Sequence, residues 1–222
     1  MLLAAVAAGA ALYATYCSSC HGSRGQGSDV APPLIGRPAA EIHLMLDTGR
    51  MPAAAPGVNE ITRKPIFSPA QIAQVVTYVR SFAPQPNASP LSISSGGNIL
   101  AGRTLFIENC AACHGATADG ASVGYGNVAP SLAGVTPMQI DEAVRTGPGV
   151  MPDFGNDVLS DRDVGDIASY VVSVHAHANL PRGPDAGGFT LAHVGPVAEG
   201  FVAWLFGLGA LVLFIRLIGT TD

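Results

Sequence analysis

Hydrophobic positions recur at helical spacing in two stretches of the chain that resemble each other, residues 68–82 and residues 160–174. The apolar positions are Ile72, Val75, Val76 and Val79 in the first stretch and Val164, Ile167, Ala168 and Val171 in the second. Ser68 and Ser160 precede the two patterns and suit helix N-caps. The pattern therefore predicts one amphipathic helix in each half of the chain.

The apolar segment 2–12 has the length and character of a signal-peptide core, but the internal repeat favours another interpretation. Residues 8–13 align with residues 101–106, which makes this segment the first helix of its half. Gly9 and Gly102 then occupy equivalent places, where a small residue lets another helix approach closely. We expect the closing amphipathic helix of each half to cross the first helix near this glycine.

A third pair of matching segments, residues 39–48 and 138–146, predicts a middle helix in each half. Both segments end in a Thr-Gly pair whose glycine suits a helix stop. Residues 84–98 are rich in Pro, Ser and Gly and predict a linker between the halves, and residues 179–196 predict a second linker.

The last apolar run, residues 197–218, is long enough to span a bilayer and has Glu199 and Arg216 as its only charges. Trp204 and Arg216 suit positions near the membrane interfaces. A composition with 48% hydrophobic and 12% charged residues agrees with a membrane-associated chain. A buried helix of a soluble protein is the alternative.

The net charge of −5 is unevenly distributed. Residues 1–86 hold six Lys and Arg against four Asp and Glu, whereas residues 101–178 hold three arginines against nine acids. Two interpretations stay open: both surfaces are simply solvated, or the two halves dock on different partners.

All four cysteines lie in two Cys-x-x-Cys-His motifs, residues 17–21 and 110–114. Cysteines at this spacing can form a redox dithiol, a zinc site or a haem attachment site, and a histidine directly after both pairs favours haem c. A four-ligand zinc site would not need that histidine twice. We therefore expect two covalently attached haem c groups. The attachment residues and iron ligands are Cys17, Cys20 and His21 in the first half and Cys110, Cys113 and His114 in the second.

Two proline segments follow the motifs at matching places and contain Pro32 and Pro130. A proline carbonyl here can accept the Nδ1 hydrogen of His21 or His114, which fixes the orientation of the imidazole ring. An ordinary proline turn is the alternative.

Of the five methionines, only Met51 and Met151 lie in matching contexts, each before a proline and shortly after the Thr-Gly pair. Met45 and Met138 each face an alanine in the other half. Methionine is often a core filler, but the repeat favours Met51 and Met151 as the sixth iron ligands. His43 faces an aspartate, so we do not expect iron held by two histidines.

An iron with histidine on one face and methionine on the other leaves little room for oxygen or peroxide, so the expected activity is outer-sphere electron transfer. A dihaem peroxidase, with one open iron face, and a haem-based sensor are alternatives. His175, His177 and His193 could hold a further metal, although isolated surface histidines are commoner.

The order of helix, haem loop, helix, Met loop and helix in each half predicts an all-α fold. Its parts are two tandem class I-type cytochrome c domains followed by one C-terminal transmembrane helix. The expected bounds are 1–83 for the first domain, 84–98 for a linker, 99–178 for the second domain, 179–196 for a linker and 197–218 for the membrane helix.

The tandem motifs, the Met-Pro pair after each, and the sequence of residues 195–200 (Gly-Pro-Val-Ala-Glu-Gly) before the last helix carry a family resemblance. Over essentially its whole length the chain resembles the dihaem cytochrome c subunit of the actinobacterial menaquinol-oxidising cytochrome bcc complex. The resemblance implies the electron-transfer subunit of a quinol:cytochrome c reductase. Its partners would be cytochrome b, the Rieske iron-sulfur protein and an aa3-type oxidase in a dimeric supercomplex, with no nucleic acid.

The resemblance implies that electrons pass from the Rieske centre to the copper site of the oxidase. We expect the first half to receive them and the second half to deliver them. Haem c is attached outside the cell membrane, so we expect a single-pass chain with outer haem domains, a cytoplasmic C-terminus and a precursor that begins upstream of Met1. The alternative is a dihaem subunit of a periplasmic dehydrogenase or of another terminal oxidase.

Overall fold

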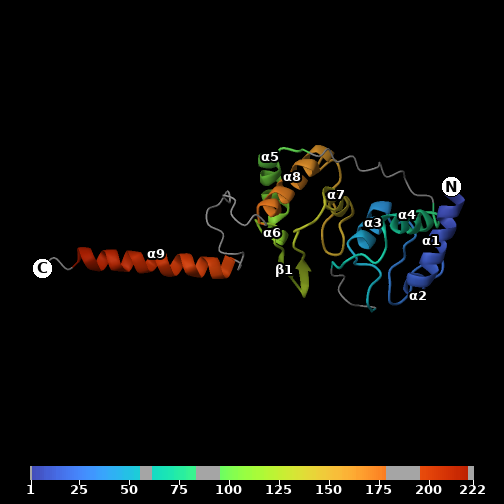
Figure 1. Ribbon diagram of the computed structural model, residues 1–222, viewed down its shortest axis with the longest axis horizontal. Coiled ribbons are helices and arrows are strands. Elements are labelled where there is room, and N and C mark those ends of the chain that lie inside the picture. The colour runs from blue at the N-terminus through green and yellow to red at the C-terminus, as the bar shows by residue number, and fades with distance from the viewer. Residues whose placement is uncertain (1, 56–61, 84–95, 179–195, 220–222) are drawn as a thin grey trace. The chain divides into compact units, whose positions relative to one another are not determined.

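The structure is a computed structural model that describes residues 2–55, 62–83, 96–178 and 196–219 (Figure 1). Contacts divide the chain into two compact units, Met1–Ala176 and His177–Asp222. The first unit holds both sequence repeats. The expected linkers fall largely on residues 84–95 and 179–195, which lie outside the described residues.

Four helices form the first repeat and confirm the helical segments expected from the sequence. They are α1 (Leu2–Tyr16), α2 (Ser18–His21), α3 (Ala39–Asp47) and α4 (Pro69–Arg80). Ser68 caps α4 as expected: its hydroxyl accepts from the Gln71 N–H, and the Gln71 side chain accepts from the Ser68 N–H in return.

The second repeat has the same helix order, α5 (Ile99–Asn109), α6 (Ala111–His114), α7 (Pro137–Thr146) and α8 (Asp161–Ala178). Thr136 caps α7 through the same reciprocal pair with Gln139. As expected, α7 ends at Gly147, which has a left-handed conformation with a φ of 56°.

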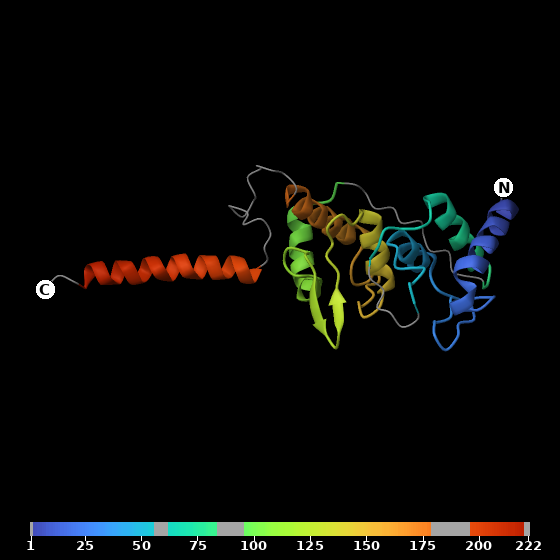
Figure 2. The same ribbon diagram turned by 60° about the horizontal axis from the view of Figure 1, so that its bottom comes forward.

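The second repeat also contains two short strands, which corrects the all-α expectation. They are β1 (Ala121–Gly124) and β2 (Asn127–Ala129), and they pair antiparallel. Figure 2 shows this hairpin extending away from the helices of its repeat. His114 and Ala129 are 15 positions apart, against 10 for His21 and Ala31, so the longer loop has enough residues to pair with itself.

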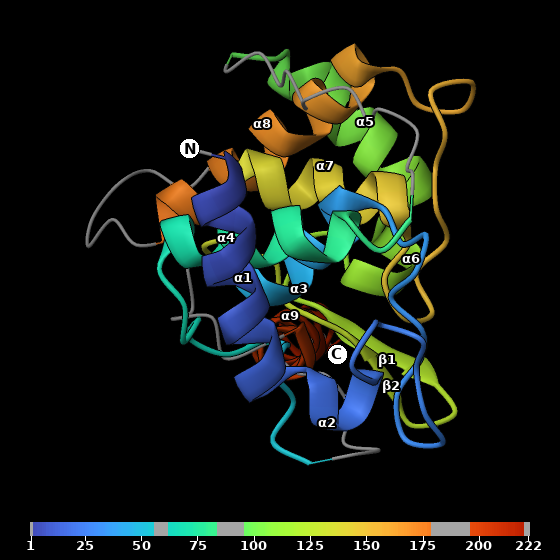
Figure 3. The same cartoon turned by 90° about the vertical axis from the view of Figure 1, so that its right-hand side faces the viewer.

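The first and last helices of each repeat cross at the expected glycines. Figure 3 shows α1 crossing α4. A Cβ on Gly9 would collide with the backbone carbonyl of Gln74 in α4, and a Cβ on Gly102 would collide with the carbonyl of Asp166 in α8. Only glycine therefore permits these two close approaches.

Each repeat has its own hydrophobic core. The first core consists of Tyr13, Ile42, Leu46, Phe67, Ile72, Val75 and Val79. The second consists of Phe106, Ala118, Ile140, Val144, Leu159, Val164, Ile167, Ala168, Tyr170 and Val171. Burial of these apolar side chains is the main favourable contribution to the stability of each repeat.

The two repeats contact each other through their middle helices, α3 and α7. Nδ1 of His43 lies 2.7 Å from a carboxylate oxygen of Glu142. The amide nitrogen of Gln139 donates to Asp47 at 2.7 Å. His43 pairs with Glu142, and Asp47, further along α3, pairs with Gln139, which comes earlier in α7. The two helices therefore run antiparallel at this contact.

The second unit contains α9 (Pro196–Ile218). Within it, Gly200–Ile218 has a mean hydropathy of 2.3 and buries none of its side chains. It is the one helix of the described residues that is long and apolar enough to cross a membrane. This agrees with the expected membrane helix 197–218.

Candidate functional site

Each Cys-x-x-Cys-His motif forms a single helical turn directly after the first helix of its repeat. Cys17 lies between α1 and α2, and its carbonyl accepts from the His21 N–H at 2.9 Å. Cys110 and His114 repeat this bond at 2.9 Å. In a helical turn, residues three and four positions apart share a face, so both thiols and the imidazole of a motif project to one side.

Both motif histidines are buried, with 8% of each side chain exposed. Nδ1 of His21 donates to the Pro32 carbonyl at 2.8 Å, and Nδ1 of His114 donates to the Pro130 carbonyl at 3.0 Å. A carbonyl oxygen can only accept, so Nδ1 carries a proton in both rings and Nε2 is the nitrogen left to bind a metal. The structure thus prepares Nε2 of each ring to bind a metal.

Met51 and Met151 are half-buried and pack against the hydrophobic cores of their own repeats. The same two cores also contact Cys17 and Cys110, so each repeat brings one motif thiol and one thioether to a common apolar cluster. Met138, in contrast, is 47% exposed at the start of α7. This arrangement favours Met51 and Met151, the two methionines in matching contexts, as the iron ligands.

The first thiol of each motif is in a poorly solvated position. Burial raises the pKa of Cys17 and of Cys110 to about 11, and the neighbouring motif cysteine adds to the effect. A redox-active dithiol needs a thiolate with a lowered pKa. The environment therefore disfavours the dithiol interpretation.

The zinc interpretation also finds no support in the described part of the chain, where no three His, Cys, Asp or Glu side chains gather as a metal site. His193 and the side chain of His177 lie outside the described residues. The site residues instead fit haem c: paired thiols for thioether bonds, an imidazole with a free Nε2, a thioether and an apolar cluster to cover the ring.

Two tyrosine hydroxyls that the sequence did not single out fasten the loops after the motifs. The Tyr13 hydroxyl donates to the Gly22 carbonyl at 2.7 Å, and the Tyr170 hydroxyl donates to the Ala116 carbonyl at 3.0 Å. Burial raises the pKa of Tyr13 to about 12, so it remains a donor at neutral pH. Tyr13 is on the first helix and Tyr170 on the last helix of its repeat, so alignment alone could not pair them.

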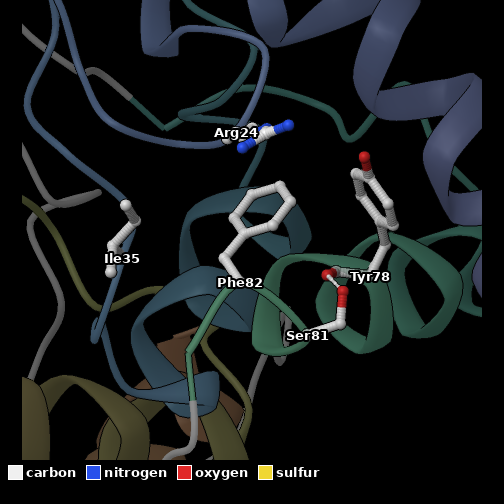
Figure 4. A pocket seen from close by; sticks show the side chains of 5 residues that line it. All are labelled: Arg24, Ile35, Tyr78, Ser81 and Phe82. Atoms are coloured by element: carbon white, nitrogen blue, oxygen red, sulfur yellow. Dashed lines mark hydrogen bonds between the residues drawn. The ribbon is translucent and has the colours of Figure 1, made fainter.

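A cavity of about 370 Å³ lies in the first repeat, between the loop after His21 and the C-terminal end of α4 (Figure 4). It is lined by Arg24, Ile35, Tyr78, Ser81 and Phe82. None of the expected attachment residues or iron ligands is in this lining. Tyr78 and Phe82 of this lining pack on the same core as Cys17 and Met51.

His43 is engaged away from the haem ligands, at the contact between α3 and α7. Its hydrogen bond with the Glu142 carboxylate raises the pKa of His43. A histidine that favours its protonated form is a poor iron ligand. The expectation that no iron is held by two histidines stays a prediction.

Comparison with known proteins gives consistent results. A family model described as cytochrome c oxidase, cbb3-type, subunit III matches the chain twice, at residues 4–79 and 97–171. The cytochrome bc1 complex cytochrome c subunit of Mycobacterium tuberculosis is 37% identical over 219 residues, which cover 95% of this chain and 76% of the relative. The subunit of the same name from Corynebacterium diphtheriae is 31% identical over 226 residues, covering 94% of this chain and 78% of the relative.

A more distant relative is the cbb3-type cytochrome c oxidase subunit CcoP of Rhodobacter capsulatus. It is 30% identical over 189 residues, covering 75% of this chain and 61% of that subunit. The double match to a cytochrome c model and the near full-length match to the bc1-complex subunits agree with the repeated motif geometry. The chain belongs to the family of cytochrome c subunits of the cytochrome bc1 complex.

Proposed function

We propose that this chain is a membrane-anchored dihaem cytochrome c that relays electrons from a Rieske iron-sulfur centre to the copper site of an associated aa3-type oxidase. One haem c is attached through Cys17 and Cys20, with His21 as an iron ligand, and the second through the equivalent residues of the other repeat. Haem c supplies an iron that cycles between two oxidation states. The membership in the bc1-complex family supports the electron-transfer role.

The observation that carries the proposal is the repeated bond from a motif histidine to a proline carbonyl, at 2.8 Å and 3.0 Å. It gives both rings the same protonation and orientation. A structural proline turn would not need to hold an imidazole Nδ1 in both repeats. Met51 and Met151, on the apolar clusters that also contact Cys17 and Cys110, complete the two ligand sets.

Other parts of the chain keep the two haem sites closed and in place. His21 and His114 are buried residues whose Nδ1 bonds lie in partly buried surroundings. Contact between α3 and α7 joins the two repeats in one unit, which supports transfer between two centres of one chain. The two repeats are class I-type domains, bounded by residues 1–83 and 99–178.

The apolar helix α9 supports anchoring in the cell membrane. Haem c is attached on the outer side, so the repeats lie outside and the C-terminus lies in the cytoplasm. Partners in this proposal are cytochrome b, the Rieske subunit and the oxidase, in a dimeric supercomplex. A subunit of another terminal oxidase is the second candidate, which the similarity to CcoP favours.

Extraction in a mild detergent, followed by identification of the subunits that stay bound, tests the proposal. We expect cytochrome b, a Rieske protein and a copper-containing aa3-type oxidase. In the same preparation, reduction by a menaquinol analogue should reach both haems before oxygen is consumed. Recovery with a cbb3-type oxidase or a soluble dehydrogenase, without cytochrome b, would contradict it.

A further inference from the structure

The segment that follows Met151 is held to the end of α7 by one cation, Arg145. Its guanidinium Nη1 donates to the Phe154 carbonyl at 3.0 Å and to the Leu159 carbonyl at 2.6 Å. Its Nη2 donates to the Asp161 carboxylate at 2.7 Å. Only 14% of the Arg145 side chain is exposed, so its two bonds to backbone carbonyls are partly shielded from water, whereas the Asp161 carboxylate is 67% exposed.

These contacts close a loop whose start is also fixed. The chain leaves α7 at Gly147, in a left-handed conformation, and returns at Phe154, whose N–H donates to the Val144 carbonyl at 2.8 Å. Met151 lies between these two points, and its N–H donates to the Pro148 carbonyl at 3.2 Å. Arg145 thus joins the last turn of α7 to the far end of the Met151 loop and to the first turn of α8.

An arginine is suited to this place because its planar group presents several donors at fixed angles. Hydrogen bonds from a charged donor are also stronger than neutral ones. Asp141 Oδ1 lies 3.6 Å from Nε of Arg145 and balances its charge inside the repeat. Asp141 and Asp161 therefore hold the guanidinium from two sides while it binds the loop carbonyls.

At the aligned positions, the first repeat has neither the arginine nor the aspartate of this arrangement. The residue that aligns with Arg145 is Asp47, which cannot donate from its side chain when ionised, and the residue that aligns with Asp161 is Pro69. Asp47 accepts instead from Gln139 on α7. The two Met loops of one chain thus differ at this aligned position, arginine in the second repeat and aspartate in the first.

We propose that Arg145 is a positioning residue that keeps the Met151 sulfur at the iron of the second haem. The inference rests on the proposed function, because it needs Met151 as an iron ligand. By fixing the far end of the loop, Arg145 reduces the freedom of Met151 to swing away. The second haem therefore resists replacement of its methionine by an external ligand better than the first haem does.

Imidazole titration of the oxidised full chain in detergent tests this, read from the sulfur-to-iron charge-transfer band and from the shifted methionine methyl resonances in NMR spectra. Met51→Ala and Met151→Ala assign each methyl resonance to one haem. We expect Arg145→Gln to lower the imidazole midpoint of the second haem by about tenfold, since several charged hydrogen bonds are lost. The midpoint of the first haem should stay unchanged. Arg145→Lys should restore part of the shift.

Arg103→Gln, an exposed arginine of α5, is the matched control and should move neither midpoint. An unchanged second midpoint in Arg145→Gln, or an equal fall at both haems, would overturn the positioning role. If Arg145→Gln does not fold, Asp161→Ala removes a single contact of Arg145 and should give a smaller shift at the second haem alone; no shift there overturns the role. A wild-type protein without a methionine resonance at the second haem would instead contradict Met151 as ligand, and with it the proposed function.

Discussion

The ring nitrogens of His21 and His43 meet different oxygen acceptors, and this difference separates a metal ligand from a structural histidine. Nδ1 of His21 donates to a neutral proline carbonyl, which leaves Nε2 as the nitrogen that can bind a metal. His43 faces the Glu142 carboxylate, which raises the pKa of His43. Protonation consumes the lone pair that a metal needs, so position in the fold decides the role of each histidine.

Removal of either proposed methionine ligand should open one haem to external ligands. We expect Met51→Ala and Met151→Ala each to bind carbon monoxide at one reduced haem per chain, with a lower potential at that haem, because the thioether raises the potential. Absorbance spectra under carbon monoxide measure this. Met138→Ala, at a side chain that is 47% exposed, should bind none. Wild-type protein that already binds carbon monoxide readily would contradict two closed irons.

The tyrosine hydroxyls should stabilise the loops that follow the motifs. Tyr13→Phe and Tyr170→Phe each remove one bond to a loop carbonyl, and we expect each to lower the free energy of unfolding by about 1 kcal/mol. Denaturant titration measures the change. In Tyr78→Phe, the lost hydroxyl has no hydrogen-bond partner among the described residues, so its stability should hardly change. Equal losses in all three variants would argue against the loop bonds.

At the residue scale, the sequence predicted the histidine bonds to proline carbonyls but not the positions of Tyr13, Tyr170 and Arg145. The histidine and the proline lie 11 positions apart in the first repeat and 16 in the second, in matching contexts. Comparison of the two repeats was therefore enough to identify them. Tyr170 and Ala116 are 54 positions apart, and the described residues of the first repeat contain no counterpart of their bond. Such contacts depend on how the helices pack, which one sequence without its fold does not specify.

The helices were predictable because local signals and the repeat agreed. A serine or threonine cap and a proline in the first turn mark the start of α4 and of α7, and a glycine marks the end of α7. The hairpin β1–β2 was not predicted, because its strands are short and their burial shows no regular alternation. Its sequence contains Gly124, Tyr125 and Gly126 at the turn, and positive φ angles at all three form it.

The glycines at the helix crossings give an element-scale prediction. Gly9→Ala and Gly102→Ala would each place a Cβ against a backbone carbonyl of the crossing helix. Because backbone cannot move aside as a flexible side chain can, we expect a loss of about 1 to 3 kcal/mol in the free energy of unfolding. Thermal unfolding followed by circular dichroism measures it. Variants as stable as the wild type would show that these helices do not cross so closely.

At the scale of the whole molecule, the contact between α3 and α7 joins two repeats of different charge. The groups that face His43 are Glu142 on α7 and Asp47 on its own helix, and both favour its protonated form. Burial raises the pKa of Glu142. The ion pair is therefore strongest between the raised pKa of Glu142 and the raised pKa of His43.

This pair should make the stability of the first unit depend on pH. The pKa of His43 is raised in the folded state. Its contribution to the free energy of unfolding is therefore fully present below the ordinary pKa of about 6.5 and is lost as pH rises through the raised pKa. We expect the wild type to exceed His43→Gln in unfolding free energy at mildly acidic pH, with the difference shrinking towards alkaline pH. A difference that grows with pH would contradict the pair.

The central claim is that both repeats carry covalent haem c, and the intact mass of the denatured chain tests it most directly. Thioether bonds survive denaturation, so the mass should exceed that of the polypeptide by two haem groups. Peptide mapping should place one at Cys17 and Cys20 and the other at Cys110 and Cys113. A mass with one haem or none, from cells that attach haem c to other proteins, would contradict the two-centre relay.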